Sequence, residues 1–133
     1  MEKEKLIGKY TIDNIYDSLK DKDKYIRREA YRALGYTKEA LKDENWYIRL
    51  EAYRKFGFTK KALKDEDWEI RLEAYRRIGF TKKAFNDKHW LIRREAYRAL
   101  YYTKKALKDK YDIIRDEAKQ CLKIQEALKR KNK

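Results

Sequence analysis

The chain contains no proline and only four glycines in 133 residues. An all-β fold needs such residues in its many turns, so the composition argues against one. The sequence also lacks an apolar run long enough to cross a bilayer. No apolar stretch of the signal-peptide type follows the charged N-terminus. We therefore expect neither a membrane span nor a secretory leader.

Residue types that commonly form disulfides, metal sites or catalytic sites are also scarce. Cys121 is the only cysteine, so an internal disulfide is impossible and a reducing, cytoplasmic location is expected. His89 is the only histidine and Ser18 the only serine, which leaves neither a metal-ligand set nor a Ser–His pair. A glycine-rich phosphate loop is missing too. The sequence predicts no catalytic, cofactor-binding or metal-binding residues, no small-molecule substrate and no enzymatic activity.

Helix-forming and charged residues make up most of the chain. Lys, Glu, Ala, Leu and Arg dominate, as in helical proteins, while a hydrophobic share of 42% is too high for a disordered chain. Lysine and arginine number 37 against 23 aspartates and glutamates, so the formal net charge is +14. This excess indicates an acidic partner, such as nucleic acid, an anionic membrane surface or an acidic protein.

A 22-residue internal repeat dominates the sequence. Glu-Ala-Tyr-Arg stands at 29–32, 51–54, 73–76 and 95–98, and a degenerate copy follows at 117–120. Isoleucine, arginine, aspartate, tryptophan and threonine recur in phase with this motif. Such repeats are typical of helical arrays, whose units must stack to bury their apolar faces.

Each unit divides into a short helix and a long helix. In residues 59–80, Thr59 can cap a short helix over 60–64 that turns Ala62 and Leu63 inward. The long helix follows from about Trp68 to Ile78.

The long helix has recognisable start and stop signals. Asp65 or Asp67 can serve as its N-cap. Gly79 stands where a left-handed residue commonly ends a helix, and the next residue is an aromatic placed for the contact that accompanies such a cap. Four-residue spacing predicts an inward-facing stripe of Ile70, Ala74 and Ile78.

The two ends depart from the pattern. Residues 11–20 are expected to form an amphipathic first helix with an apolar side made of Ile12, Ile15, Tyr16 and Leu19. Tyr101 replaces a glycine, so its turn is expected to differ. Lys123 replaces the next glycine, and the last helix can therefore run from about Asp112 toward Arg130, carrying Ile114, Ala118, Leu122 and Leu128.

We therefore predict one all-α domain built of helical repeats. It comprises an N-terminal cap segment (1–14), the repeats (15–124) and a basic C-terminal tail or helix end (125–133). Residues 11–131 are expected to contain paired helices and no strand.

The repeated phrase resembles a known family. Leu-Lys-Asp-x-x-Trp-x-Ile-Arg-x-Glu-Ala-x-x-x-apolar-Gly is similar to HEAT-like repeats, which pair an Asp with a following Val/Ile-Arg. The short period is closer to the leucine-rich-repeat-variant class, in which short and long helices alternate. The resemblance covers roughly residues 11–124 and implies a right-handed α-solenoid of about five two-helix units. It is uninformative about activity, because such scaffolds serve many functions.

Columns of polar and aromatic residues can be interpreted in two ways. Aspartate and arginine recur together (Asp43/Arg49, Asp65/Arg71 and Asp87/Arg93). A catalytic group is needed once, whereas a packing device is needed in every unit, so we expect a structural ladder in which Arg71 is buried with acidic or carbonyl partners. The tryptophan and tyrosine columns could stack nucleic-acid bases. Packing on the next repeat is the favoured interpretation.

The lysine columns have no evident scaffold role. Lys60 and Lys64 are expected to face solvent together, although like charges at this spacing repel. Arg76 and Arg98 form an outward column that can be neutralised by glutamates three residues earlier. The candidate binding residues are Lys38, Lys42, Lys60, Lys61, Lys64, Lys82, Lys83, Lys104, Lys105, Lys108, Arg76 and Arg98.

The sequence thus favours a non-enzymatic scaffold that binds DNA or RNA by phosphate contacts. A module that docks an acidic protein, as an adaptor or inhibitor, is the alternative. A lysine face kept for solubility would give the same pattern.

Overall fold

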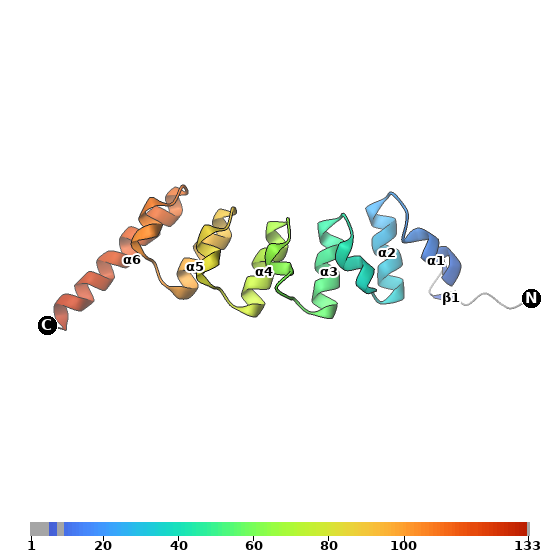
Figure 1. Cartoon of the computed structure of the whole chain (residues 1–133), viewed down its shortest axis with the longest axis horizontal. Coiled ribbons are helices and arrows are strands. Elements are labelled where there is room, and N and C mark those ends of the chain that lie inside the picture. Colours follow the sequence, from blue (N-terminus) through green and yellow to red (C-terminus); the bar gives the residue numbers. More distant parts are fainter. Residues whose placement is uncertain (1–5, 8–9, 133) are drawn as a thin grey trace, which may run out of the picture. The chain divides into compact units, whose positions relative to one another are not determined.

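The computed structural model describes residues 6–7 and 10–132, and these form an essentially all-helical protein (Figure 1). The all-α class is therefore confirmed. The elements in chain order are β1 (Leu6–Ile7), β2 (Tyr10–Thr11), α1 (Ile12–Ser18), α2 (Lys24–Leu34), η1 (Lys38–Lys42), α3 (Trp46–Phe56), η2 (Ala62–Lys64), α4 (Trp68–Ile78), η3 (Lys82–Asn86), α5 (Trp90–Leu100), η4 (Lys104–Lys108) and α6 (Asp112–Lys131).

One short antiparallel pairing interrupts the helical pattern. Leu6 pairs with Thr11 and Ile7 with Tyr10. The prediction of no strand from residue 11 onward is therefore wrong at Thr11, where a β-branched residue favours the extended backbone. The first helix consequently begins at Ile12 and ends at Ser18, two residues short of the predicted Lys20.

The chain divides into two compact units, Met1–Ala62 and Leu63–Lys133. In the first, α1 packs on α2, and η1 packs on α3. In the second, η3 packs on α5 and η4 packs on α6, while α4 contacts α5. Each unit thus combines short helices with the long helices that follow them.

The long helices α2 to α6 begin at residues 24, 46, 68, 90 and 112, a constant spacing of 22 residues. The residue before the start of each long helix is its N-cap. In four of these helices the N-cap side chain accepts a hydrogen bond from a backbone N–H of the first turn, at Asp23, Asn45, Asp67 and His89. Tyr111 makes no such bond. The predicted span of α4, from Trp68 to Ile78, and its cap at Asp67 are both confirmed.

The long helices end in different ways. Gly35 takes the left-handed conformation, with φ 79° and ψ 24°. Gly79 was predicted to do the same but has φ 120° and ψ 142°, so its backbone is extended at a positive φ. Tyr101 has φ 169° and ψ 155°, ordinary extended backbone that any residue adopts. At Lys123 nothing interrupts the helix, and α6 continues to Lys131 as expected.

The short helices are 3₁₀ rather than α-helical. Thr37, Thr81 and Thr103 precede three of them but make no side-chain capping bond, so the predicted role of the threonine column is wrong there. The threonine carbonyl instead accepts the N–H of the alanine three residues later, as in Thr59 to Ala62. In that unit the helix starts only at Ala62.

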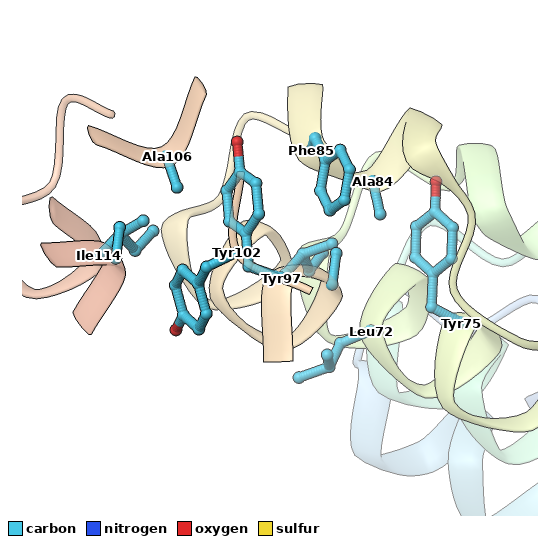
Figure 2. Packing of buried hydrophobic residues seen from close by; sticks show 11 residues of the cluster. Leu72, Tyr75, Ala84, Phe85, Tyr97, Tyr102, Ala106 and Ile114 are labelled. Atoms are coloured by element: carbon cyan, nitrogen blue, oxygen red, sulfur yellow. The ribbon is translucent and has the colours of Figure 1, made fainter. Parts of the chain in front are cut away.

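Alanine, isoleucine and tyrosine from successive elements form the core of the second unit (Figure 2). Ala84 and Ala106 of the short helices and Ile114 of α6 are fully buried. Tyr97 stacks on Phe85 at 4.3 Å between ring centroids. In the first unit, the core contains Tyr31, Ala40, Ile48 and Ala52.

Several expected core residues lie outside it. Ile78 is 46% exposed, because Phe80 folds back on Tyr75 at 5.4 Å and closes that end of the core instead. Tyr16 and Leu128 are also exposed, since the elements beside them leave those helix faces uncovered. Leu72 is buried in the core of the second unit, although the four-residue spacing did not identify it.

Candidate functional site

Arg71 is held by four hydrogen bonds. Its Nε and Nη2 atoms donate to the two carboxylate oxygens of Asp87, both at 3.0 Å. Its Nη1 donates to the carbonyls of Asp65 at 2.9 Å and Glu66 at 3.1 Å. The Arg71 side chain is 13% exposed and that of Asp87 8%. This bidentate geometry confirms the predicted structural ladder and satisfies a charge held beside the core.

The same arrangement recurs in both units. Arg27 pairs with Asp43 and Arg93 with Asp109, each sixteen residues further along the chain. The partner is thus the aspartate of the next repeat, while the aspartate of the same repeat offers only its carbonyl. Burial would raise the pKa of Asp109, but the bonds from Arg93 and from the Tyr111 N–H hold that pKa below its ordinary value.

Each aspartate of the ladder also orders the following turn. Asp87 accepts the backbone N–H of His89 at 2.9 Å, and Asp109 accepts that of Tyr111 at the same distance. These carboxylates are therefore buried and engaged by both an arginine and a backbone N–H, so the aspartate column serves the scaffold.

The outward arginines pair across repeats. Arg76 donates to Glu95 at 2.5 Å and Arg98 to Glu117 at 2.6 Å, nineteen residues later. The glutamate three residues earlier therefore neutralises Arg76 only in part, since Glu73 contributes less to it than Glu95 does. Both guanidinium groups are half exposed and already paired, which weakens them as candidate ligand-binding groups.

Glu117 joins three donors at the junction of α5 and α6. Arg94, Arg98 and the Tyr102 hydroxyl all donate to its carboxylate. Burial alone would raise the pKa of Glu117, but these bonds hold that pKa at about 2. Burial and the bond to Glu117 raise the pKa of Tyr102 to about 12.

The aromatic columns are covered by protein. Tyr31, Tyr53, Tyr75 and Tyr97 are at most 6% exposed. Trp68 stacks on His89 at 3.9 Å, and Trp90 stacks on Tyr111 at 4.2 Å. Packing on the next repeat, the favoured interpretation, thus accounts for Trp68 and Trp90, while Tyr75 and Tyr97 stack on Phe80 and Tyr102, which follow their own helices.

His89 is a structural residue. Its Nδ1 accepts the N–H of Leu91 at 3.2 Å while its ring stacks on Trp68. Burial lowers the pKa of His89, Arg71 and Arg93 lower it further, and Asp87 opposes them.

The candidate lysines are all exposed, but the 3₁₀ geometry changes which of them share a face. In a 3₁₀ helix, residues three apart align and residues four apart do not. Lys105 and Lys108 therefore face the same side, whereas Lys104 and Lys108 do not. The expected pairing of Lys60 with Lys64 fails for a related reason, because Lys60 precedes η2.

One surface groove in the second unit gathers four lysines. Lys88, Lys105, Lys108 and Lys110 line it together with Asp87 and Asp109. Its volume of about 560 Å³ lies within the range of small-ligand sites. Because Arg71 and Arg93 already neutralise the two aspartates, the four lysines give the groove an uncompensated positive charge. We call it the lysine groove.

A neighbouring groove is lined largely by residues 22 positions earlier in the sequence, and it is less basic. Lys64, Lys83 and Lys88 line it, along with Glu66. Asn86 lies between the two grooves and accepts a hydrogen bond from Lys105. Lys82 and Lys104 line neither groove.

Lys88 and Lys110 were missed by the sequence interpretation. They occupy a column that reads Lys22, Glu44, Glu66, Lys88 and Lys110, so the charge changes sign along the chain. This change from glutamate to lysine was the feature of the sequence that could have identified Lys88 and Lys110 as candidate binding residues. In the first unit, Lys38 and Lys42 are exposed on η1, and Lys60 and Lys61 lie in the turn that follows α3.

Comparison with models of protein families, with curated proteins and with solved structures finds no match. Among the described residues, no three His, Cys, Asp or Glu side chains are grouped to hold a metal ion. Within residues 6–7 and 10–132, every helix is too short or too polar to span a membrane.

Proposed function

We propose that the paired helices stack into a right-handed α-solenoid of about five HEAT-like units. The 22-residue spacing of the long helices supports this arrangement. So do the Arg–Asp links, which join Arg27, Arg71 and Arg93 to the aspartate of the following repeat. The scaffold itself is non-enzymatic, because its buried carboxylates and its histidine are committed to the fold.

The function we infer for this scaffold is to bind nucleic acid through phosphate contacts. The lysine groove is the observation that carries the proposal. Four ammonium groups surround one concavity in which both carboxylates are already neutralised by arginine. Phosphates supply the matching negative charge, and lysine binds them as a mobile point charge that requires no fixed geometry.

Sequence-independent binding is expected from the same geometry. The aromatic columns are packed against protein, so they are not offered as platforms for bases. Phosphate contacts position a nucleic acid without distinguishing its sequence. A single cysteine suits work in a reducing compartment such as the cytoplasm.

Two matched triple variants test the site. One changes Lys88, Lys105 and Lys108 of the lysine groove to Gln. The other changes Lys60, Lys82 and Lys104, which recur every 22 residues in the sequence, to Gln. Both remove three positive charges from exposed positions, so differences in affinity report the location of the charges.

Binding is measured by fluorescence anisotropy at several salt concentrations with duplex DNA, single-stranded DNA and RNA. For duplex DNA, each lost phosphate contact should reduce the slope of log affinity against log salt by about 0.9. We expect the groove variant to lose about two or three contacts and the row variant at most about one.

Equal losses in the two variants would remove the groove from the proposal and leave only diffuse charge. Failure of the unmodified chain to bind any of the three nucleic acids at low salt would reject nucleic-acid binding altogether. The lysines would then form a docking face for an acidic protein or a solubility device.

A further inference from the structure

The turn after α2 differs from the turns after α3 and α4. Gly35 has φ 79° and ψ 24°, and Tyr36 follows it with φ 60°. The N–H of Tyr36 donates to the Tyr31 carbonyl at 2.7 Å, which closes a left-handed helix cap. Gly57 and Gly79 instead have extended backbone, with ψ 147° and 142°. The same short sequence of glycine, aromatic residue and threonine therefore adopts two conformations.

The left-handed form of this turn is strained. Within the part of the chain that the structure describes, Tyr36 is the one residue other than glycine with a positive φ, which bulky side chains rarely adopt. Its hydroxyl oxygen and that of Thr37 are buried, and neither has a hydrogen-bond partner among the described residues. Burying a polar group without a partner is unfavourable. Thr59 and Thr81, at the positions equivalent to Thr37, are exposed to solvent.

The junction of α5 and α6 shows the acceptor that the Tyr36 hydroxyl lacks. There the Tyr102 hydroxyl donates to Glu117, which also accepts hydrogen bonds from Arg94 and Arg98. The same four residue types stand three repeats earlier, at the junction of α2 and α3, as Arg28, Arg32, Tyr36 and Glu51.

The arginine and the tyrosine of this quartet occur together in the sequence. In the two intervening repeats, leucine replaces the first arginine and phenylalanine replaces the tyrosine, at Leu50 and Phe58 and at Leu72 and Phe80. Arg28 and Arg32 already donate to Glu51, at 3.2 Å and 2.6 Å. The bond from the tyrosine is thus the one part of the quartet that the left-handed turn leaves unmade.

We propose that the turn after α2 is a conformational switch. Its major position is the left-handed form, and its second position is the extended form seen after α3 and α4, in which the Tyr36 hydroxyl donates to Glu51. Gly35 permits both positions, because glycine adopts positive φ without a side-chain clash. The second position latches the turn to α3, as the bond from Tyr102 to Glu117 latches the turn after α5 to α6.

The aromatic ring can keep its place during the exchange. Tyr36 stacks on Tyr31 with ring centroids 5.8 Å apart, and Tyr102 stacks on Tyr97 at 5.5 Å. The second position loses the cap bond from the Tyr36 N–H and gains a bond from the hydroxyl to a carboxylate. One hydrogen bond is exchanged for another, so the two positions are expected to be close in free energy and both populated.

Backbone amide relaxation dispersion, measured by NMR, detects exchange between two such positions. The test compares residues 35–37 with residues 79–81, which have the same glycine, aromatic and threonine order but a phenylalanine without a hydroxyl. We expect exchange on the microsecond-to-millisecond timescale at 35–37 and none at 79–81.

Two variants should each suppress the exchange. Tyr36→Phe keeps the ring, as in the repeats with Phe58 and Phe80, but removes the hydroxyl. The population of the second position should then fall by about tenfold or more, since a bond to a charged acceptor is lost. Gly35→Asn should hold the left-handed form, which asparagine tolerates. Its Cβ would lie 3.2 Å from the Lys55 Nζ, the end of a flexible side chain that can move aside.

Tyr25→Phe is the matched control. It also removes a tyrosine hydroxyl from the same repeat, but Tyr25 is 63% exposed at the start of α2, so the exchange should remain unchanged. Urea unfolding supplies a second measurement. Tyr102→Phe should destabilise the protein clearly more than Tyr36→Phe, because the Tyr102 bond is present in the major conformation.

Absence of exchange at 35–37 in the unmodified chain would overturn the proposal. So would exchange that persists in Tyr36→Phe, exchange of equal size at 79–81, or equal destabilisation by Tyr36→Phe and Tyr102→Phe. All of these measurements are made without nucleic acid, so their outcomes are independent of the function proposed for the lysine groove.

Discussion

At the scale of single residues, Arg71 is an arginine of the buried ladder, like Arg27 and Arg93. Its four hydrogen bonds satisfy Asp87 and two backbone carbonyls beside the core. We expect Arg71→Ala to lower the free energy of unfolding by about 1–3 kcal/mol, because it leaves the buried Asp87 carboxylate without its counter-charge. Urea unfolding followed by circular dichroism measures the loss.

Arg76→Ala is the matched control for that experiment. Its side chain is 54% exposed, and an exposed pair such as Arg76–Glu95 contributes at most about 1 kcal/mol. If both arginines gave equal losses, the distinction between a buried ladder and a surface pair would be wrong.

His89 gives the protein a pH-sensitive residue. Its folded-state pKa is lowered by burial, so the folded state disfavours the proton that the unfolded chain accepts near pH 6.5. The stabilising contribution is complete above that pH and is lost as the pH falls toward the lowered value. Protonation would also abolish acceptance of the Leu91 N–H by Nδ1.

Melting temperatures measured between about pH 8 and pH 5 test this prediction, since histidine is the side chain that ordinarily titrates there. His89→Asn should flatten the profile, because Asn45 caps the equivalent helix by accepting the N–H groups of Tyr47 and Ile48. An unchanged slope in the variant would assign the pH dependence to other groups.

The sequence predicted that each arginine of the ladder must be satisfied, but it did not identify the partner. Burial of Arg71 follows from its position beside Ile70, a neighbour in sequence. Its pairing with Asp87 depends on how two repeats meet, which no local pattern encodes. The same limit explains why Arg76 was assigned a glutamate of its own helix rather than Glu95.

At the scale of elements, the turn after α4 depends on glycine. Gly79 has a positive φ of 120° with extended ψ, a region that side chains rarely adopt. A methyl group there would meet no atom within 4 Å, so any cost is backbone strain. We expect Gly79→Ala to lower the free energy of unfolding by about 1–3 kcal/mol.

The corresponding turn after α5 supplies the comparison. Tyr101 has ordinary extended backbone and is 52% exposed. Tyr101→Ala should therefore change the stability by no more than about 0.5 kcal/mol. A loss at Gly79 no larger than the loss at Tyr101 would show that the strain is relieved by a local shift.

The junction of α5 and α6 depends on an ionised Glu117. Its pKa of about 2 in the folded protein lies below the ordinary value of 4.5. Its stabilising effect is therefore complete above about pH 4.5 and is lost as the pH falls toward 2. Glu117→Gln should be less stable at neutral pH and should show a smaller loss on acidification, as measured by urea unfolding at each pH.

The existence and order of the helices could be predicted, but the pairing of β1 with β2 and the type of the short helices could not. Five-residue segments satisfy both α and 3₁₀ geometry in sequence, and the choice depends on how the buried alanine, such as Ala84, fits against the next long helix. That choice decides which lysines align, so Lys105 and Lys108 share a face of η4 although the sequence analysis expected residues four apart to do so.

At the scale of the whole molecule, positive charge is concentrated toward the C-terminal unit. The segment 37–58 has a net charge of +1, and the segment 103–124 has +3. We expect Lys105→Glu with Lys108→Glu to weaken nucleic-acid binding on the order of tens of fold near 0.1 M salt, because two phosphate contacts are lost. A control change of two exposed lysines on η1, Lys38→Glu with Lys42→Glu, should have a much smaller effect.

Both double variants reverse two exposed lysines on a short helix, so net charge and fold are matched. Filter binding at a fixed salt concentration measures the difference. Equal losses would indicate that nucleic acid follows the lysines of both units rather than a site in the C-terminal one.

The links between repeats span fixed separations along the chain. The aspartate bound by a ladder arginine lies sixteen residues later for Arg27, Arg71 and Arg93. The glutamate bound by an outward arginine lies nineteen residues later for Arg32, Arg76 and Arg98. A gene encoding such a chain can gain or lose a whole 22-residue segment by recombination between its similar stretches. Every arginine left with a downstream segment would still meet a carboxylate at the same separation. The number of repeats can therefore change in evolution while every contact between neighbouring repeats stays of the same type.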